Sequence, residues 1–291
     1  MLTSDTDTIA LQRFLVIQTA SIGDVILATA VIEKLHNHFP GAAIDFMTKK
    51  GNEALFAGHP FLNKLLLWDK SKHKYRNLLH LLKEVRSTRY DYLINLQRFA
   101  ATGLFTVLSK AEYTSGFDKN PFSHRFTYRA VHRISAEDNI HEIQRNQALI
   151  SPFTDDMPAR PRLYPTADDF KAFDSFKTKA YLCIAPASLW FTKQLPERQW
   201  ISLIRAIPPE FRVMLLGSQQ DHGLSERIMK ESGSERCMNL AGRLSLLQSA
   251  ALMQDAVMNY VNDSSPMHLA SAVNARTTAV FCSTVPQFGF G

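Results

Sequence analysis

Three loops hold the residues whose types and spacing could do chemistry. The first runs from Thr19 to Asp24, between a β-branched run at 13–18 and a helical pattern at 25–38. Free N–H groups and the positive dipole end make a helix start favourable for anions, and Gly23 would let a ligand come close. Asp24 could act there as a general base that takes the proton of an attacking hydroxyl. Asp is also a preferred N-cap residue, so the spacing alone leaves both roles open.

The second loop, at 262–268, again joins a predicted strand to a predicted helix. Pro266 suits the first helical turn. The amides and hydroxyls of Ser264 and Ser265 could hold phosphate oxygens, while His268 adds a donor one turn into the helix. The alternative is an ordinary capped helix with a core histidine.

The third loop, at 185–196, follows a predicted strand and presents the hydroxyl of Ser188, aromatic side chains and Lys193. The charge of Lys193 could neutralise a pyrophosphate. A lone lysine is more often simply solvated, so this loop is informative only together with the other two.

Several common site motifs are absent from the sequence. It contains no G-x-G-x-x-G after the first strand, no G-x-x-x-x-G-K-[ST], no G-x-S-x-G and no H-E-x-x-H. These absences argue against the common dinucleotide-binding, P-loop, hydrolase and zinc-protease classes. No metal-ligand spacing is present either, so we predict no metal site.

Short apolar strands alternate with helical patterns along the chain, which is typical of parallel sheets covered by helices. A Pro-rich stretch at 151–165 interrupts the alternation. We therefore predict two Rossmann-like doubly wound α/β domains, 1–160 and 161–291, with ligands in the cleft between them. The predicted strands are 13–18, 43–47, 65–68, 90–95, 181–185, 211–216, 256–261 and 277–281, and the predicted helices are 25–38, 76–87, 138–149, 197–206, 224–231, 245–254 and 266–273.

The composition is that of an ordinary globular protein, with 291 residues, 45% hydrophobic and 21% charged. The first ten residues contain no basic residue, and no apolar run approaches the roughly 18 residues that a membrane span needs. Cys183, Cys237 and Cys282 lie far apart beside apolar neighbours, which predicts reduced core thiols. We therefore predict a cytoplasmic protein.

Positive charge is concentrated in the first half of the chain. Residues 64–133 hold 14 Lys or Arg against 5 Asp or Glu, whereas the net charge of the whole chain is only +6. This excess indicates an anionic partner, although the run from Lys70 to Arg76 is also explained by a solvated loop and helix start. No nucleic-acid-binding motif accompanies the charge, so we predict no nucleic-acid partner.

Four blocks of the sequence together resemble glycosyltransferase family 9, which includes the bacterial ADP-heptose:lipopolysaccharide heptosyltransferases. The blocks are residues 14–29, 185–196, 239–246 and 262–270, and their order and spacing cover nearly the whole chain. The resemblance implies the two-domain GT-B architecture, with an acceptor-binding N-terminal domain, a donor-binding C-terminal domain and the active site in the cleft between them.

The same resemblance implies the reaction and the residues that perform it. It implies that a sugar, first of all heptose from ADP-heptose, is transferred with inversion to a lipopolysaccharide-core or other cell-envelope glycan. Asp24 would be the general base, and no cofactor or metal ion would be needed. The partners implied are the nucleotide-sugar donor and an anionic glycolipid acceptor, which a peripheral protein would meet at the inner face of the cytoplasmic membrane. Ser21 and Gly23 would belong to the acceptor-side loop. The donor-binding residues implied are Ser188, Lys193, Gln219, Leu244, Asp263, Ser264, Ser265 and His268.

Three features depart from the family pattern. The family usually shows Asp-Ser-Gly where this chain has Asp263-Ser264-Ser265, and heptosyltransferases can have a glutamate on the nucleotide's ribose where this chain has Gln219. The chain also stops at Gly291, soon after a strand, which predicts a truncated C-terminal end. Two alternatives therefore stay open: a nucleotide-sugar epimerase of GT-B fold, and a non-catalytic nucleotide-sugar or glycan-binding protein.

Overall fold

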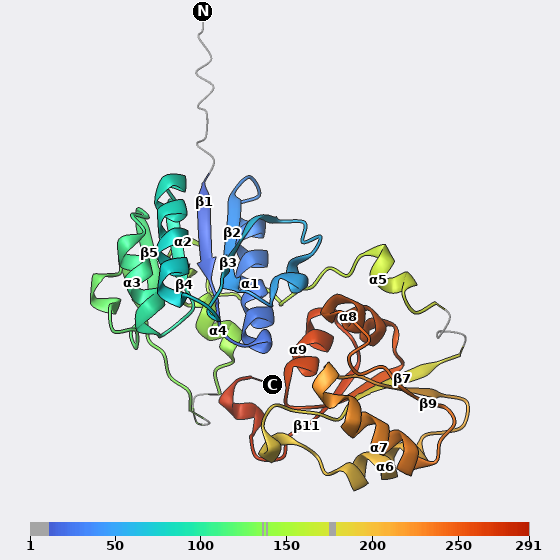
Figure 1. Cartoon of the computed structure of the whole chain (residues 1–291). Helices are drawn as coiled ribbons and strands as arrows, with labels where there is room; N and C mark the ends of the chain where they lie inside the picture. The colour runs from blue at the N-terminus through green and yellow to red at the C-terminus, as the bar shows by residue number, and fades with distance from the viewer. Residues whose placement is uncertain (1–11, 136, 138, 175–178, 291) are drawn as a thin grey trace, which may run out of the picture.

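A computed structural model describes residues 12–135, 137, 139–174 and 179–290 of the chain. The first ten residues, whose composition argues against a secretion signal, lie outside the described residues. Figure 1 shows two lobes, each built on one sheet, with the first half of the chain in one lobe and the second half in the other.

The N-terminal lobe contains a parallel sheet in the order β3-β2-β1-β4-β5-β6. Chain order reverses between β1 and β4, and this switch point is where doubly wound sheets bind ligands. The strands are β1 Arg13–Ile17, β2 Ala43–Lys49, β3 Leu62–Trp68, β4 Tyr92–Asn95, β5 Tyr113–Phe117 and β6 Tyr128–Ala130, and the helices are α1 Ile22–His38, α2 Lys74–Thr88, α3 Ala100–Leu108 and α4 Glu142–Gln147.

The two faces of this sheet are covered by different helices because side chains alternate along each strand. In β1, Phe14 and Val16 join the hydrophobic cluster that includes α1, whereas Leu15 and Ile17 join the cluster beneath α2 and α3. A strand buried on both faces reads as a continuous apolar run, which is why β1 is visible in the sequence.

The C-terminal lobe repeats the arrangement with a parallel sheet in the order β11-β10-β7-β8-β9. Its switch point lies between β7 and β10, so the loops that follow these two strands meet at one edge. The strands are β7 Tyr181–Ala185, β8 Arg212–Leu215, β9 Cys237–Asn239, β10 Met258–Asn262 and β11 Thr277–Val280, and the helices are α5 Ala167–Lys171, α6 Glu197–Ala206, α7 His222–Ser232, α8 Leu246–Asp255 and α9 Ser265–Ala272.

Helix α1 joins the two lobes. It packs against its own sheet, against α4 and against α9 of the other lobe, so it is apolar around most of its circumference and largely buried. The segment that connects the lobes follows the same helix: the Arg162 N–H donates to Thr29 Oγ1 at 2.9 Å and the Leu163 N–H donates to the Ala272 carbonyl at 3.2 Å. The carboxyl edges of both sheets therefore converge beside the N-terminus of α1.

Most predicted elements are confirmed, and the differences have local causes. The predicted helix at 138–149 is wrong in extent, because α4 covers only Glu142–Gln147 and residue 138 lies outside the described residues. Helices α3 and α5 and strands β5, β6 and β9 were not predicted. Strand β5 has the sequence YTSGF, in which small and polar residues replace the β-branched run that marks a buried strand.

The expectation of three core thiols is wrong at one position. Cys183 and Cys237 are buried, and burial raises the pKa of both thiols, whereas Cys282 is exposed. Its apolar neighbours in sequence, Phe281 and the end of β11, do not cover it. None of the helices within the described part of the chain is long and apolar enough to cross a membrane.

Candidate active site

Asp24 is the third residue of α1, and the residue that caps the helix is Ser21. Ser21 donates its backbone N–H at 3.1 Å and its hydroxyl at 2.5 Å, both to Asp24 Oδ2. The interpretation of Asp24 as the N-cap is therefore wrong by three positions, although Asp24 does stabilise the helix start. Among the described residues, Oδ1 of Asp24 accepts no hydrogen bond, so one carboxylate oxygen remains available to a ligand.

Gly23 is required for a close contact between the lobes. A Cβ atom at Gly23 would lie 2.6 Å from Cδ2 of His268, closer than such atoms approach. The ring of His268 thus occupies the space that a side chain at position 23 would need, and the close approach of a ligand to Gly23 stays a prediction. This contact brings the start of α9 against the start of α1, next to Asp24.

His268 is neutral at physiological pH in this position. Burial lowers the pKa of its imidazole to about 4, although the carboxylates of Asp263 and Asp24 act in the opposite direction. The ring therefore provides one donor and one acceptor between two carboxylates without adding a positive charge.

Lys193 pairs with Asp263 in this structure. Its Nζ lies 2.6 Å from Oδ2 of Asp263, and the hydroxyl of Thr284 donates to the same oxygen at 2.5 Å. The Asp263 side chain is only 7% exposed, so its charge requires these partners. The interpretation of Lys193 as a lone solvated lysine is wrong, and a diphosphate that reached Lys193 would have to share it with Asp263.

A pocket of about 560 Å³ lies at the switch point of the C-terminal sheet. Ile22, from the start of α1, also lines this pocket, which therefore lies between the lobes. Five of the predicted donor-binding residues line it: Ser188, Gln219, Leu244, Ser264 and Ser265.

The other three predicted donor-binding residues are not among those that line this pocket. Lys193 and Asp263 line a second, smaller pocket of about 300 Å³ with Thr284 and Phe288, and His268 packs on Gly23.

Gly242 explains how Gln219 reaches the larger pocket. The φ of Gly242 is +78°, and a Cβ atom there would lie 2.2 Å from Oε1 and 2.7 Å from Cα of Gln219. A glycine is needed both for the left-handed backbone and for this approach. The pocket wall that carries Gln219 therefore depends on the turn at 240–243.

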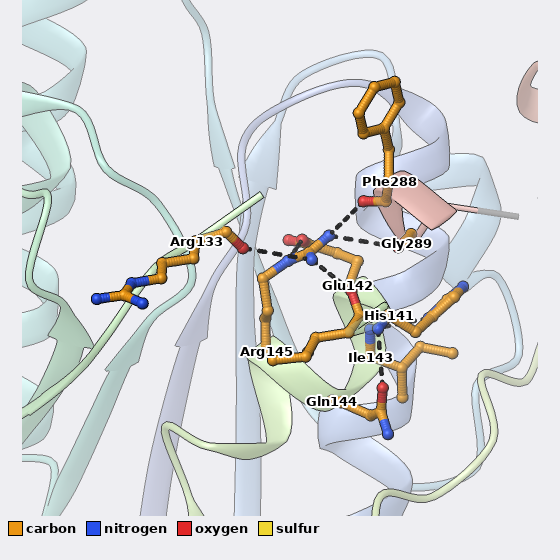
Figure 2. Close-up of polar contacts among 9 residues, drawn as sticks. Arg133, His141, Glu142, Ile143, Gln144, Arg145, Phe288 and Gly289 are labelled. Atoms are coloured by element: carbon orange, nitrogen blue, oxygen red, sulfur yellow. Dashed lines mark hydrogen bonds and ion pairs between the residues drawn. The ribbon is translucent and has the colours of Figure 1, made fainter. Parts of the chain in front are cut away.

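A buried ion pair beside Asp24 was not predicted from the sequence. Figure 2 shows Arg145 and Glu142 on the first turns of α4, with Arg145 Nε donating to Glu142 Oε2 at 2.7 Å. Burial raises the pKa of Glu142, Arg145 opposes this shift, and the charge of Asp24 adds to it. The pair is therefore near enough to Asp24 to interact with it electrostatically.

The same pair holds a segment of the other lobe. Arg145 donates from Nη2 to the carbonyls of Phe288 and Gly289 at 3.2 and 3.3 Å, and the Glu142 N–H donates to the Gly289 carbonyl at 2.6 Å (Figure 2). This segment begins four residues after Thr284, the partner of Asp263. The chain from Thr284 to Gly289 thus links the Lys193 ion pair with the Arg145–Glu142 pair near Asp24.

A second unpredicted group lies at the carboxyl end of β1. Lys70 donates from Nζ to the carbonyl and the hydroxyl of Thr19, both at 2.8 Å, and Thr19 donates to Gln97 Oε1 at 2.7 Å. Burial lowers the pKa of Lys70 to about 8. Lys70 is therefore not part of a solvated run, and it holds the loop that leads to Ser21.

The geometry can support a proton transfer and a displacement in one place. Ile22 at the start of α1 and Ser264 and Ser265 at the start of α9 line the larger pocket. Asp24 is two residues after Ile22, and Asp263, which pairs with Lys193, directly precedes Ser264. Within the described residues, no group of three or more His, Cys, Asp or Glu side chains could hold a metal ion.

The fold and this site define a two-domain α/β protein of GT-B type with a ligand pocket between its domains. Residues 78–289 match the family model for glycosyltransferase family 9 (heptosyltransferase), and the chain belongs to this family.

Relatives and solved structures agree with this assignment over most of the chain. The lipooligosaccharide heptosyltransferase 2 of Haemophilus influenzae is 25% identical over an alignment that covers 95% of this chain and 85% of that relative. The crystal structure of a family 9 glycosyl transferase from Veillonella parvula matches with a TM-score of 0.86 at 19% identity, over 96% of this chain and 83% of that one. The Escherichia coli ADP-heptose lps heptosyltransferase II matches with a TM-score of 0.80 at 21% identity, over 95% and 87% of the two chains.

Proposed function

We propose that this glycosyltransferase moves heptose from ADP-heptose to a lipopolysaccharide-core acceptor, with inversion at the anomeric carbon and without a metal ion or cofactor. The observation that carries the proposal is the shared pocket: Ile22 of α1 lines the same cavity as Ser188, Ser264 and Ser265, and Asp24 is two residues further along α1. The names of the relatives in Haemophilus influenzae and Escherichia coli support heptose, ADP and lipopolysaccharide as the substrate classes.

In this mechanism Asp24 accepts the proton of the acceptor hydroxyl through Oδ1, the oxygen that Ser21 leaves free. The hydroxyl oxygen then attacks the anomeric carbon from the face opposite the diphosphate. The bond between that carbon and the diphosphate oxygen breaks, and ADP leaves with the electron pair. Ser21 and Gly23 form the acceptor side of this arrangement, and the N-terminal domain, 1–160, binds the acceptor.

The C-terminal domain, 161–291, binds the donor and stabilises the leaving group. Negative charge that develops on the diphosphate faces the free amides at the start of α9 and the ammonium group of Lys193. Ser188, Gln219, Leu244, Ser264 and Ser265 contact the nucleotide sugar in the pocket that they line. Asp263 keeps Lys193 oriented until the diphosphate arrives.

Neutral His268 fits this scheme electrostatically. An imidazolium beside Asp24 would stabilise the ionised carboxylate and weaken it as a base, whereas the neutral ring does not. Its remaining hydrogen-bonding capacity can serve the sugar hydroxyls.

The excess of basic residues in the N-terminal domain supports an acceptor that carries carboxylates and phosphates, as the inner core of lipopolysaccharide does. Such an acceptor is anchored in a membrane. We therefore propose that the enzyme works from the cytoplasm as a peripheral protein at the inner face of the cytoplasmic membrane.

The experiment is a product analysis of the purified chain with ADP-heptose, with and without a heptose-free core glycolipid. The proposal predicts a glycolipid gain of one heptose by mass spectrometry, ADP release in equal amount, and an inverted anomeric configuration by NMR. An epimeric nucleotide sugar formed without acceptor would instead assign an epimerase. ADP-heptose binding with no product would assign a binding protein, and transfer from UDP- or GDP-sugars alone would contradict the ADP assignment.

A further inference from the structure

The outer side of helices α2 and α3 is an exposed surface that the proposed chemistry does not use. Both helices cover the same face of the N-terminal sheet, and their inner sides pack on one cluster that includes Trp68, Leu82 and Phe105. Figure 1 shows the two helices as a layer on the side of this lobe away from α1 and the other lobe. Their outer sides therefore face solvent.

Helix α3 presents an apolar stripe on that outer side. Ala100, Leu104 and Leu108 recur at four-residue spacing, and Leu104 and Leu108 are 44% and 39% exposed. Phe99, which precedes the helix, is 63% exposed. The sequence of α3, AATGLFTVL, contains no charged residue, whereas a helix that faces water usually carries its charges there.

Helix α2 combines exposed apolar and basic side chains. Tyr75 and Leu79, one turn apart, are 68% and 59% exposed, and Arg76, Lys83 and Arg86 are exposed on the same side. The helix contains one carboxylate, that of Glu84. It points to the opposite side, where its Oε1 lies 2.5 Å from Nζ of Lys64. The outer side of α2 is therefore positive without compensation from its own helix.

We propose that the α2–α3 surface, which consists of Tyr75, Arg76, Leu79, Lys83, Arg86, Phe99, Leu104 and Leu108, docks on an anionic lipid bilayer. The aromatic and leucine side chains enter the interface between headgroups and acyl chains, and the basic side chains contact lipid phosphates. A bilayer can contact both the apolar and the basic side chains of this surface. A nucleic acid would pair with the basic residues but leave the α3 stripe in water.

The location of the surface connects docking with the proposed function, which this inference extends. Helices α2 and α3 start at the carboxyl edge of the sheet, the same edge that carries the loop before Ser21. Lys70, just before α2, bonds to Thr19 in that loop. A bilayer on the outer side of the two helices therefore lies next to the edge where an acceptor would bind.

The test is sedimentation of the full chain with vesicles of phosphatidylethanolamine and phosphatidylglycerol in equal parts, compared with vesicles of phosphatidylcholine alone. The proposal predicts binding to the anionic vesicles that weakens about 30-fold when Lys83→Gln and Arg86→Gln are combined. Leu104→Ser combined with Leu108→Ser weakens it roughly tenfold. A matched control combines Arg198→Gln and Lys230→Gln, which remove two exposed charges from the C-terminal domain and leave binding unchanged.

Several results would overturn the proposal. One is absence of binding to anionic vesicles, and another is an equal loss in the control, because net charge alone would then explain binding. A third is a dimer in vesicle-free solution that dissociates when Leu104→Ser and Leu108→Ser are combined, although this variant still binds vesicles. That result would assign the surface to a second copy of the chain. ADP titration of the same variants separates this test from the proposed function, because vesicle binding requires neither donor nor acceptor.

Discussion

Arg145 holds the segment at 288–289 of the C-terminal lobe against the N-terminal lobe, and its replacement by methionine tests whether this contact stabilises the arrangement. The Arg145 side chain is 3% exposed and that of Glu142 is 8% exposed. The substitution Arg145→Met leaves the Glu142 carboxylate buried without its cation and removes the donor to the carbonyls of Phe288 and Gly289. Loss of one partner of a buried ion pair costs about 3–5 kcal/mol of unfolding free energy.

A double-mutant cycle measures how much of the loss of unfolding free energy comes from the interaction between Arg145 and Glu142. Arg145→Met and Glu142→Met are each expected to lower the unfolding free energy by about 3–5 kcal/mol, and the double variant loses at least about 2 kcal/mol less than their sum. Urea unfolding followed by circular dichroism at neutral pH provides the values. Arg133→Met is the control, because its backbone carbonyl faces Arg145 while its side chain is exposed and points away (Figure 2), so the change stays within about 0.5 kcal/mol. A loss below about 1 kcal/mol for Arg145→Met, or additivity of the two single changes, would refute the reasoning.

Three further predictions concern two residues of the site and two buried histidines elsewhere in the chain. Gly23→Ala places a methyl group against the ring of His268, so transfer should fall at least tenfold while thermal stability drops by a few degrees; normal transfer would show that the two lobes do not need this contact. Lys193→Ala should weaken ADP binding in calorimetry by roughly tenfold, because a charge-assisted contact to the diphosphate is lost, and unchanged affinity would remove Lys193 from the donor site. Burial lowers the pKa of His59 and of His132 to about 4, so between about pH 6.5 and 4 the unfolded chain binds protons at these residues that the folded chain does not bind. The unfolding free energy should therefore fall as the pH drops over this range. Melting temperatures that stay constant would contradict the prediction.

The sequence predicted the strands and helices that have a clear local pattern of apolar or capping residues. Strands β1 and β7 are buried on both faces and read as apolar runs, and the loop at 262–268 shows its helix start through Pro266. Strand β5 escaped prediction because its polar and small residues form a strand only through pairing with β4 and β6. Local pattern therefore predicted the two doubly wound sheets but not every strand in them.

Site residues that act through distant partners could not be predicted in the same way. The spacing of Glu142 and Arg145 suggests a helical ion pair, but nothing near them in sequence indicates that they hold residues about 140 positions later. The role of Lys70 in holding a loop is not visible in its basic run, because its partner, Thr19, lies 51 residues earlier. The pairing of Lys193 with Asp263 likewise depends on two loops that meet only at the switch point of the folded sheet.

The central claim is that Asp24 is the base for sugar transfer, and one comparison tests it most directly. Asp24→Asn keeps the size of the side chain and a hydrogen-bond acceptor for Ser21, so the start of α1 and the donor pocket should persist. Heptose transfer from ADP-heptose is measured alongside ADP affinity, with exposed Asp168→Asn as the control. The account predicts that turnover falls about 100-fold to 10,000-fold in Asp24→Asn while ADP affinity is unchanged. Turnover equal to that of the unaltered chain, with acceptor and donor both bound, would contradict it.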